Sequence, residues 1–170
     1  IFATADLWSD VRDEWPDEPI VRFVPGDDSG TFDYFVDEIF GGDAQAALIG
    51  NPNTSEDDDQ LAGGINRTDF SIGYFGYAYY LENRDALNIV SVEGIEPSVE
   101  TVEDNSYALS RPLYIYVNRD SLENKHQVAA FVDYYLTHVN EEIEEVGYFA
   151  ASEDTLDEAR QIWLDVIGAE

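Results

Sequence analysis

The sequence predicts an α/β fold in which short strands alternate with amphipathic helices. Residues Ile20–Val24 read IVRFV, a β-rich run that ends at Pro25-Gly26. Apolar residues over Phe32–Phe40 then recur at the spacing of one helix face, and Gly41-Gly42 ends that helix. A strand, a tight turn and a helix, followed by further alternating runs, indicate a layered α/β architecture.

The other elements follow from the same patterns. Before the first strand, Leu7–Trp15 predicts a short helical or irregular segment that ends at Pro16. Ser55 is the expected N-cap of a helix whose first turn holds the acidic run Glu56–Asp59. The remaining predicted elements are a helical turn over Ala44–Ile49, a strand running into a helix over Ser71–Leu81, a strand over Asn88–Val92, an extended loop over Gly94–Asn105, a strand over Tyr107–Asn118, and helices over Lys125–Asn140 and Thr155–Ile167.

The charge balance predicts a surface adapted to high salt. The chain has 37 Asp and Glu against 8 Lys and Arg, a formal net charge of −29, and Lys125 is its single lysine. The acids are spread over the whole length, and at about 1 M salt their repulsion is screened within about 3 Å. An acidic protein from an ordinary environment is the alternative. In either case nucleic acids and anionic lipids are excluded as partners, because both require cationic surfaces.

Several other classes are excluded by composition. The chain has no cysteine, which rules out disulfides, thiol catalysis and cysteine metal sites. No run approaches the roughly 18 apolar residues of a membrane-spanning helix. There is also no methionine and no signal peptide, so we expect a mature or excised piece with any export signal upstream. No cofactor is predicted.

The segment PGDDSGTF, residues 25–32, carries the strongest candidate site. It joins the first strand to a helix that begins near Ser29, and the start of a helix leaves backbone N–H groups without intrahelical acceptors. An oxyanion there could accept N–H bonds from Gly30, Thr31 and Phe32 and hydroxyl bonds from Ser29 and Thr31. Gly30 lacks a Cβ, which lets the anion approach the backbone closely.

The neighbouring acids suggest a filter for protonated anions. Phosphate near neutral pH carries at least one O–H, which the carboxylate of Asp27 or Asp28 could accept. Sulfate carries none, so the same carboxylate would repel it. The competing structural interpretation is that Asp28 or Ser29 simply caps the helix, contributing about 1 kcal/mol. The residues alone leave these two interpretations nearly even.

Two further interpretations are weaker. A nucleophilic Ser29 needs a base within reach, and the only histidines, His126 and His138, fall on a later amphipathic helix. The acidic run Glu56–Asp59 lacks the alternating spacing of a calcium loop, so a solvated helix start is expected there instead of a metal site.

Five motifs taken together resemble the phosphate-binding component of ABC-type phosphate importers. They are PGDDSGTFDYF, SEDDD, IGYFGYAYY, YALSRPLYIYVN and VGYF, and the similarity runs from about Leu7 to Phe149. The resemblance implies a type II periplasmic-binding-protein-like fold, namely a three-layer α/β/α lobe with a mixed sheet. It also implies a non-enzymatic extracellular protein that captures inorganic phosphate for the membrane subunits of an ABC permease. By motif, Asp28, Ser29, Gly30 and Thr31 would bind the ligand.

The resemblance covers mainly the second lobe of that family. It implies a solute-binding lobe over residues 1–150 and a C-terminal helix over 151–170 that packs on the lobe or at the lobe junction. A missing first lobe, or a second copy in a dimer, would supply the other half of the site. A cell-surface anchor is expected outside this sequence.

One departure concerns the arginine that the family usually places against phosphate. Pro25 and Phe32 flank the turn, and Ala44–Asn53 contains no arginine. Arg67 is a conjectural substitute, and Ser55 is a further candidate contact. Bidentate arginine binds phosphate strongly. Its absence leaves open an alternative function, an interaction or structural module of the same fold that has lost phosphate binding.

Overall fold

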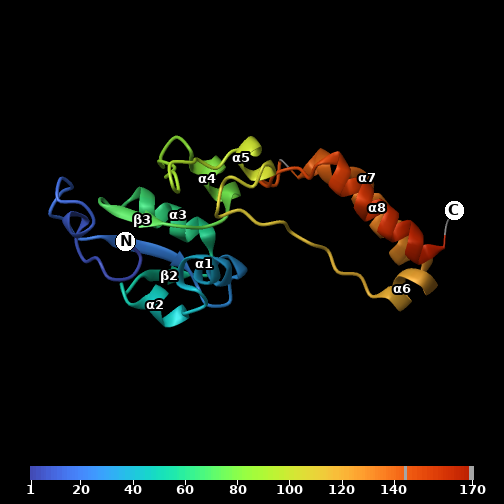
Figure 1. Ribbon diagram of the computed structural model, residues 1–170, viewed down its shortest axis with the longest axis horizontal. Coiled ribbons are helices and arrows are strands. Elements are labelled where there is room, and N and C mark those ends of the chain that lie inside the picture. Colours follow the sequence, from blue (N-terminus) through green and yellow to red (C-terminus); the bar gives the residue numbers. More distant parts are fainter. Residues whose placement is uncertain (144, 169–170) are drawn as a thin grey trace. The chain divides into compact units, whose positions relative to one another are not determined.

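The computed structural model describes residues 1–143 and 145–168 (Figure 1). The chain divides into two compact units, Ile1–Val90 and Ser91–Glu170, and each is described by itself. This division falls elsewhere than the predicted boundary at residue 150. The last helix belongs to the second unit, whereas the last two residues of the predicted C-terminal segment lie outside the described residues.

The first unit contains the sheet. Its elements are a 3-10 helix η1 (Trp8–Asp10), β1 (Val21–Pro25), α1 (Gly30–Phe40), α2 (Ala44–Leu48), β2 (Asn53–Ser55), α3 (Asp58–Asn66), β3 (Ser71–Gly73) and α4 (Tyr77–Asn83). The strand order is β2-β1-β3 and both pairings are parallel. In register, Pro25 of β1 pairs with Ser55 of β2, and Phe23 pairs with Gly73 of β3.

Helices cover both faces of this sheet, as the α/β prediction requires. The chain moves from β1 to β2 on one side and then back past β1 to β3. Because such crossovers are right-handed, α1 and α3 lie on opposite faces. On the α1 side, Phe32, Val36 and Ala47 form a buried cluster, against which Phe40 and Tyr74 pack. On the α3 side, Leu61 is almost completely buried.

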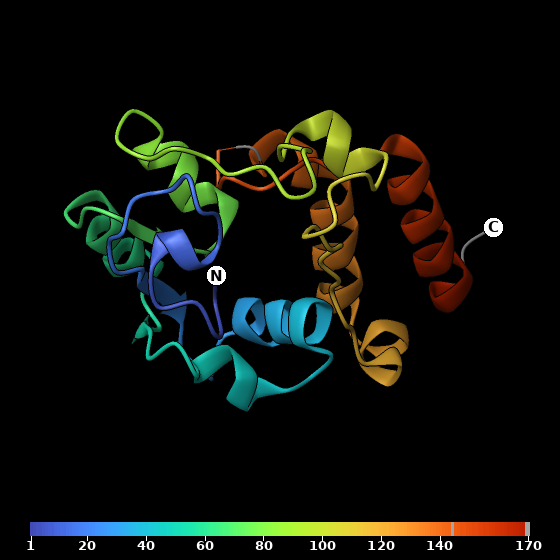
Figure 2. The same cartoon turned by 60° about the vertical axis from the view of Figure 1, so that its left-hand side comes forward.

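The second unit is helical in its described residues. It comprises α5 (Val99–Glu103), α6 (Arg119–Asn124), α7 (His126–Glu142) and α8 (Glu153–Ile167), and Figure 2 shows α7 and α8 as two separate long helices, although their side chains pack together. Leu122, Val132 and Leu136 form its core, with Trp163 of α8 packed against them. The Asn140 side chain bonds both the N–H and the carbonyl of Ala151, which joins the end of α7 to the segment before α8.

Three sequence predictions in the middle of the chain are wrong. Asn88–Val92 is not a strand, since only an isolated bridge joins Val92 to Ile95. The expected loop Gly94–Asn105 contains α5. Tyr107–Asn118 is irregular and, among the described residues, pairs with no strand. Its pattern is that of a strand, but a strand needs a partner for its backbone groups.

The irregular backbone of these segments has two consequences. The described sheet is parallel throughout, whereas a mixed sheet was predicted, because no antiparallel strand joins it. Apolar side chains of the irregular segment also remain exposed: Leu113 is 63% and Tyr116 92% accessible.

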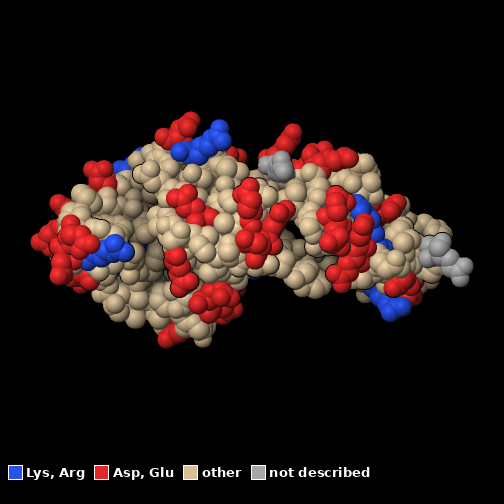
Figure 3. Space-filling view, turned by 45° about the horizontal axis from the view of Figure 1, so that its top comes forward, with Lys and Arg blue, Asp and Glu red and all other residues tan. Residues whose placement is uncertain are grey.

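The surface is acidic, as the composition indicates. Figure 3 shows carboxylates over much of the visible face and few Lys or Arg. Within the described residues, no helix is both long and apolar enough to cross a membrane.

Candidate functional site

The carboxyl ends of β1 and β2 bring two loops together. Pro25 and Ser55 are register partners, and the N–H of Gly26 donates to the Ser55 carbonyl at 3.0 Å. The connection after β1 leads to α1 on one face of the sheet, and the connection after the neighbouring β2 leads to α3 on the other face. In open α/β sheets this reversal opens a crevice at the carboxyl edge, where ligands characteristically bind.

The start of α1 forms one side of this edge. Ser29 is the N-cap, with extended backbone (φ −89°, ψ 125°), and its Oγ accepts from the N–H of Thr31 at 3.2 Å. The Ser29 N–H donates to the Gly26 carbonyl at 3.1 Å, which closes the turn between strand and helix. The predicted helix start and the serine cap are therefore confirmed. With its eleven residues, α1 directs the positive end of its dipole to this edge.

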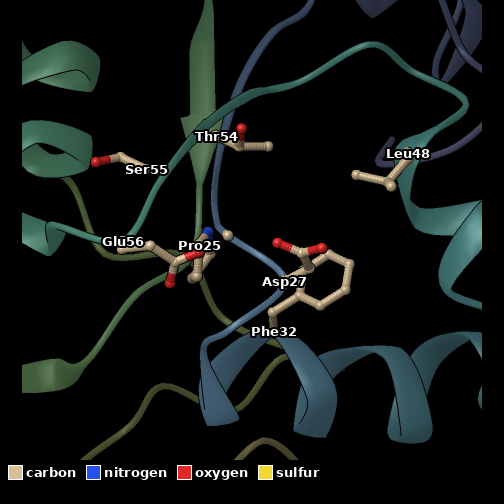
Figure 4. Close-up of a pocket in the computed structure, with 8 residues that line it drawn as sticks. Pro25, Asp27, Phe32, Leu48, Thr54, Ser55 and Glu56 are labelled. Carbon is tan, nitrogen blue, oxygen red and sulfur yellow. The ribbon is translucent and has the colours of Figure 1, made fainter.

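A pocket of about 440 Å³ lies beside the helix start. Its lining residues are Pro25, Gly26, Asp27, Phe32, Leu48, Thr54, Ser55 and Glu56. In Figure 4 the Asp27 carboxylate points from the turn toward the space between Thr54 and Leu48. Of the predicted site residues, Asp27, Phe32 and Ser55 line the pocket, whereas Asp28, Ser29, Gly30 and Thr31 form the adjoining turn and first helical residues.

Ser55 is placed differently from its predicted role as N-cap. It ends β2, and its Oγ accepts from the N–H of Asp57 at 3.0 Å. Asp57 is the N-cap of α3 and accepts from the N–H groups of Asp59 and Gln60. The sequence held a signal for this arrangement, because Asp57 and Gln60 have the spacing of a capping box. The acidic run therefore begins α3 two residues later than predicted.

Because the cap is Asp57, Glu56 falls in the loop before α3, and sequence reasoning missed it as a site residue. Its Oε1 accepts from the N–H of Asp28 at 3.3 Å. A Cβ at position 26 would overlap this carboxylate, with the Glu56 Cδ only 2.5 Å away, so Gly26 is required for the contact. The carboxylate therefore lies directly on the β1–α1 turn (Figure 4).

Asp58 connects this edge to β3. It is partly buried, and its Oδ2 accepts from the N–H of Gly76, the N-cap of α4, at 3.2 Å. Burial raises the pKa of Asp58, the Gly76 hydrogen bond opposes the rise, and the adjacent carboxylates of Asp57 and Asp59 add to it. Asp57 and Asp58 thus act as caps for N–H groups. Among the described residues, no cluster of three or more His, Cys, Asp or Glu could hold a metal ion.

The arginine of β1 points elsewhere. Arg22 is buried, and burial lowers the pKa of its guanidinium. The guanidinium donates to backbone carbonyls of Ile1, Ala5, Ile20 and Gly50. Those bonds hold the N-terminal segment and the α2–β2 loop against β1, so Arg22 has a structural role.

Arg67 does not reach the pocket edge. It is the C-cap of α3, at the opposite end of that helix from Asp57. Nine residues of α-helix span about 13 Å. No Lys or Arg is among the residues that line the pocket.

Comparison with known proteins places this architecture in a family. Residues 1–139 match the family described as PBP superfamily domain. The chain is 40% identical over 156 residues to protein SphX of Synechocystis and 35% identical over 156 residues to the phosphate-binding protein PstS of Staphylococcus aureus. Each match covers 89% of this chain and 46% of the relative, so the chain spans about half the length of these curated relatives.

Solved structures agree with the fold. A crystal structure of a possible phosphate binding protein from Planctomyces limnophilus superposes with a TM-score of 0.73 at 33% identity, covering 96% of this chain and 59% of that one. PstS from Borrelia burgdorferi gives a TM-score of 0.65 at 25% identity, covering 87% and 58%. The resemblance noted from the sequence motifs is thereby confirmed, and the chain belongs to the PBP superfamily domain family.

Proposed function

We propose that this chain is a non-enzymatic, extracellular solute-binding domain that captures inorganic phosphate for the membrane subunits of an ABC permease. The observation that carries the proposal is the start of α1, where Ser29, Gly30 and Thr31 adjoin a pocket at the carboxyl edge of the sheet. Relatives named phosphate-binding proteins support the choice of ligand. Phosphate would accept N–H bonds from the first helical residues, and Asp27 or Asp28 would accept its O–H.

Several features support binding over catalysis. Ser29 Oγ is engaged as a helix cap by the Thr31 N–H. Neither histidine lines the pocket, and His138 Nδ1 lies 2.8 Å from the Glu141 carboxylate on the surface of α7. A serine nucleophile needs a base and a group that orients it. The geometry of Ser29 is that of a binding turn.

The other half of the site is part of the same proposal. A solute-binding lobe encloses its ligand against a second lobe, and lobe closure is the mechanical step. We propose that a first lobe outside this sequence, or a second copy of this chain, supplies that surface, and that an anchor outside the sequence holds the protein at the cell surface. Light scattering of the 170-residue chain in molar salt tests whether a second copy supplies the surface, because that arrangement requires a dimer.

The test of phosphate binding is a titration of ¹⁵N-labelled protein in molar salt. Phosphate should shift the amide resonances of Gly30 and Thr31, and sulfate should not. Ser29→Ala should weaken the response to phosphate. The matched control is Ser152→Ala in α8, because Ser152 Oγ also accepts an N–H bond of 3.2 Å as an N-cap. Both variants lose a cap contributing about 1 kcal/mol, but only the first touches the site. Unmoved Gly30 and Thr31 amides would refute the proposal.

One observation favours a second candidate function. The pocket lining contains two carboxylates and no Lys or Arg, and the Asp28 N–H is already used by Glu56. An interaction or structural module that has lost phosphate binding accounts for this arrangement, and it predicts no response to either anion.

A further inference from the structure

Two carboxylates from separate loops line the same pocket. Asp27 follows β1 and Glu56 follows β2, and the pairing of Pro25 with Ser55 brings the two loops together. Figure 4 shows the Glu56 side chain on one side of Pro25 and the Asp27 carboxylate on the other, and both residues line the pocket. One of these two carboxylates would be enough to accept one O–H group of phosphate.

Glu56 is held in position by the backbone that it contacts. Its Oε1 accepts from the Asp28 N–H, and the missing side chain of Gly26 leaves the space that the carboxylate fills. The β1–α1 turn and the residue before α3 therefore form one unit. An anion bound at this edge would therefore lie close to the negative charge of Glu56.

The surrounding groups do not offset that charge. The titratable side chains on the two loops and the first turn of α3 are all acidic: Asp27, Asp28, Glu56, Asp57, Asp58 and Asp59. Helix α2 carries no titratable group, and the first turn of α1 adds Asp33. Helix α4 adds Tyr77, Tyr79, Tyr80 and Glu82. The guanidinium of Arg22 is buried among backbone carbonyls. A dianion would therefore meet two carboxylates with only backbone dipoles to oppose them.

We propose that the site takes phosphate as its monobasic form, with Asp27 and Glu56 each accepting one of its two O–H groups. This inference rests on the proposed function. The dibasic form has one O–H, so its binding leaves one carboxylate facing an unprotonated oxygen, and it carries twice the charge. Sulfate has no O–H group, so both carboxylates would repel it. Glu56 is thus the residue that determines which protonation state binds.

The experiment is phosphate binding measured as a function of pH by equilibrium dialysis in molar salt. Only the monobasic fraction is competent to bind, so the apparent Kd should rise about tenfold for each pH unit above the second pKa of phosphate, which is near neutrality. Neither histidine is among the residues that line the pocket.

The variant Glu56→Gln tests whether the pH dependence of binding comes from the protons of phosphate that Glu56 accepts. Glutamine keeps the length and an acceptor for the Asp28 N–H but removes the charge. The variant should bind more tightly than the wild type above neutrality, and its affinity should depend less steeply on pH. Glu38→Gln, an identical change at an exposed position of α1, should leave the pH profile unchanged.

The outcomes distinguish this inference from the proposed function. Binding that is equal or tighter at high pH, or an unaltered profile in Glu56→Gln, overturns the monobasic preference and leaves phosphate binding intact. Absence of binding at every pH, in both the wild type and Glu56→Gln, refutes the proposed function itself.

Discussion

Helix α3 lies close to the central strand, and this packing can be tested by comparing the stabilities of alanine variants at two adjacent glycines. Gly63 and Gly64 both lie in the interior of α3. A Cβ on Gly64 would meet the Phe23 ring, overlapping Cε1 and lying 2.7 Å from Cδ1 and 3.0 Å from Cζ. A Cβ on Gly63 would meet only the guanidinium of Arg67, at 3.0 Å from Nη1, which can turn into solvent.

The expected magnitudes follow from these contacts. Replacing either glycine by alanine gains about 1 kcal/mol of helix propensity. Overpacking against an aromatic ring costs about 1–3 kcal/mol. Gly63→Ala should therefore stabilise the first unit by up to about 1 kcal/mol, whereas Gly64→Ala should be neutral or destabilise it by up to about 2 kcal/mol. The propensity term cancels between the two, which leaves a difference of about 1–3 kcal/mol that reports the packing alone.

The assay is urea unfolding in molar salt, followed by hydrogen exchange of peptides that cover β1 and α3. This readout reports the first unit by itself, so the second unit does not blur the transition. Equal stability of the two variants would refute the packing of α3 on Phe23. A Gly63→Ala variant less stable than Gly64→Ala would refute it as well.

Three further predictions concern the charged groups. Arg22→Lys should destabilise the first unit by about 1–3 kcal/mol in thermal melts, because a point charge cannot serve all the buried carbonyls. Asp58 has a raised pKa, so its contribution to stability is complete below its ordinary value of 3.8 and is lost as pH rises through the raised value. Asp58→Asn, which keeps an acceptor for Gly76, should abolish this loss, and melts from pH 3 to 7 should be flatter than those of the wild type. Lowering the salt from about 1 M to about 0.01 M lengthens screening from about 3 Å to about 30 Å and should lower Tm; an unchanged Tm contradicts the high-salt interpretation.

The first βα unit could be predicted from sequence because its signals are local. The apolar run before Pro25 forms β1, the helical period gives α1, and Gly41 ends it in the left-handed conformation at φ 60°. The cap at Ser29 also follows from neighbouring residues alone. Each of these features depends on side chains within a few positions along the chain, which is why a linear sequence reveals them.

The other strands depended on partners far away in the chain. The strand β2 is three polar residues, Asn53–Ser55, with no apolar signature, and it exists because β1 pairs with it. Tyr107–Asn118 has the pattern of a strand but is not part of the sheet in the described residues. Hydrogen bonds between strands are non-local, so propensity alone decides neither case.

The candidate site likewise combines features that the sequence predicts with features that only the tertiary structure determines. The sequence alone predicted the fold class, the acidic surface and the turn that holds Ser29–Thr31, because composition and short motifs carry that information. Tertiary structure alone decided that Glu56 lies on that turn, that Arg22 is occupied by buried carbonyls and that Arg67 lies at the far end of α3. Charges act through space, and only the folded chain determines which of them face a bound anion.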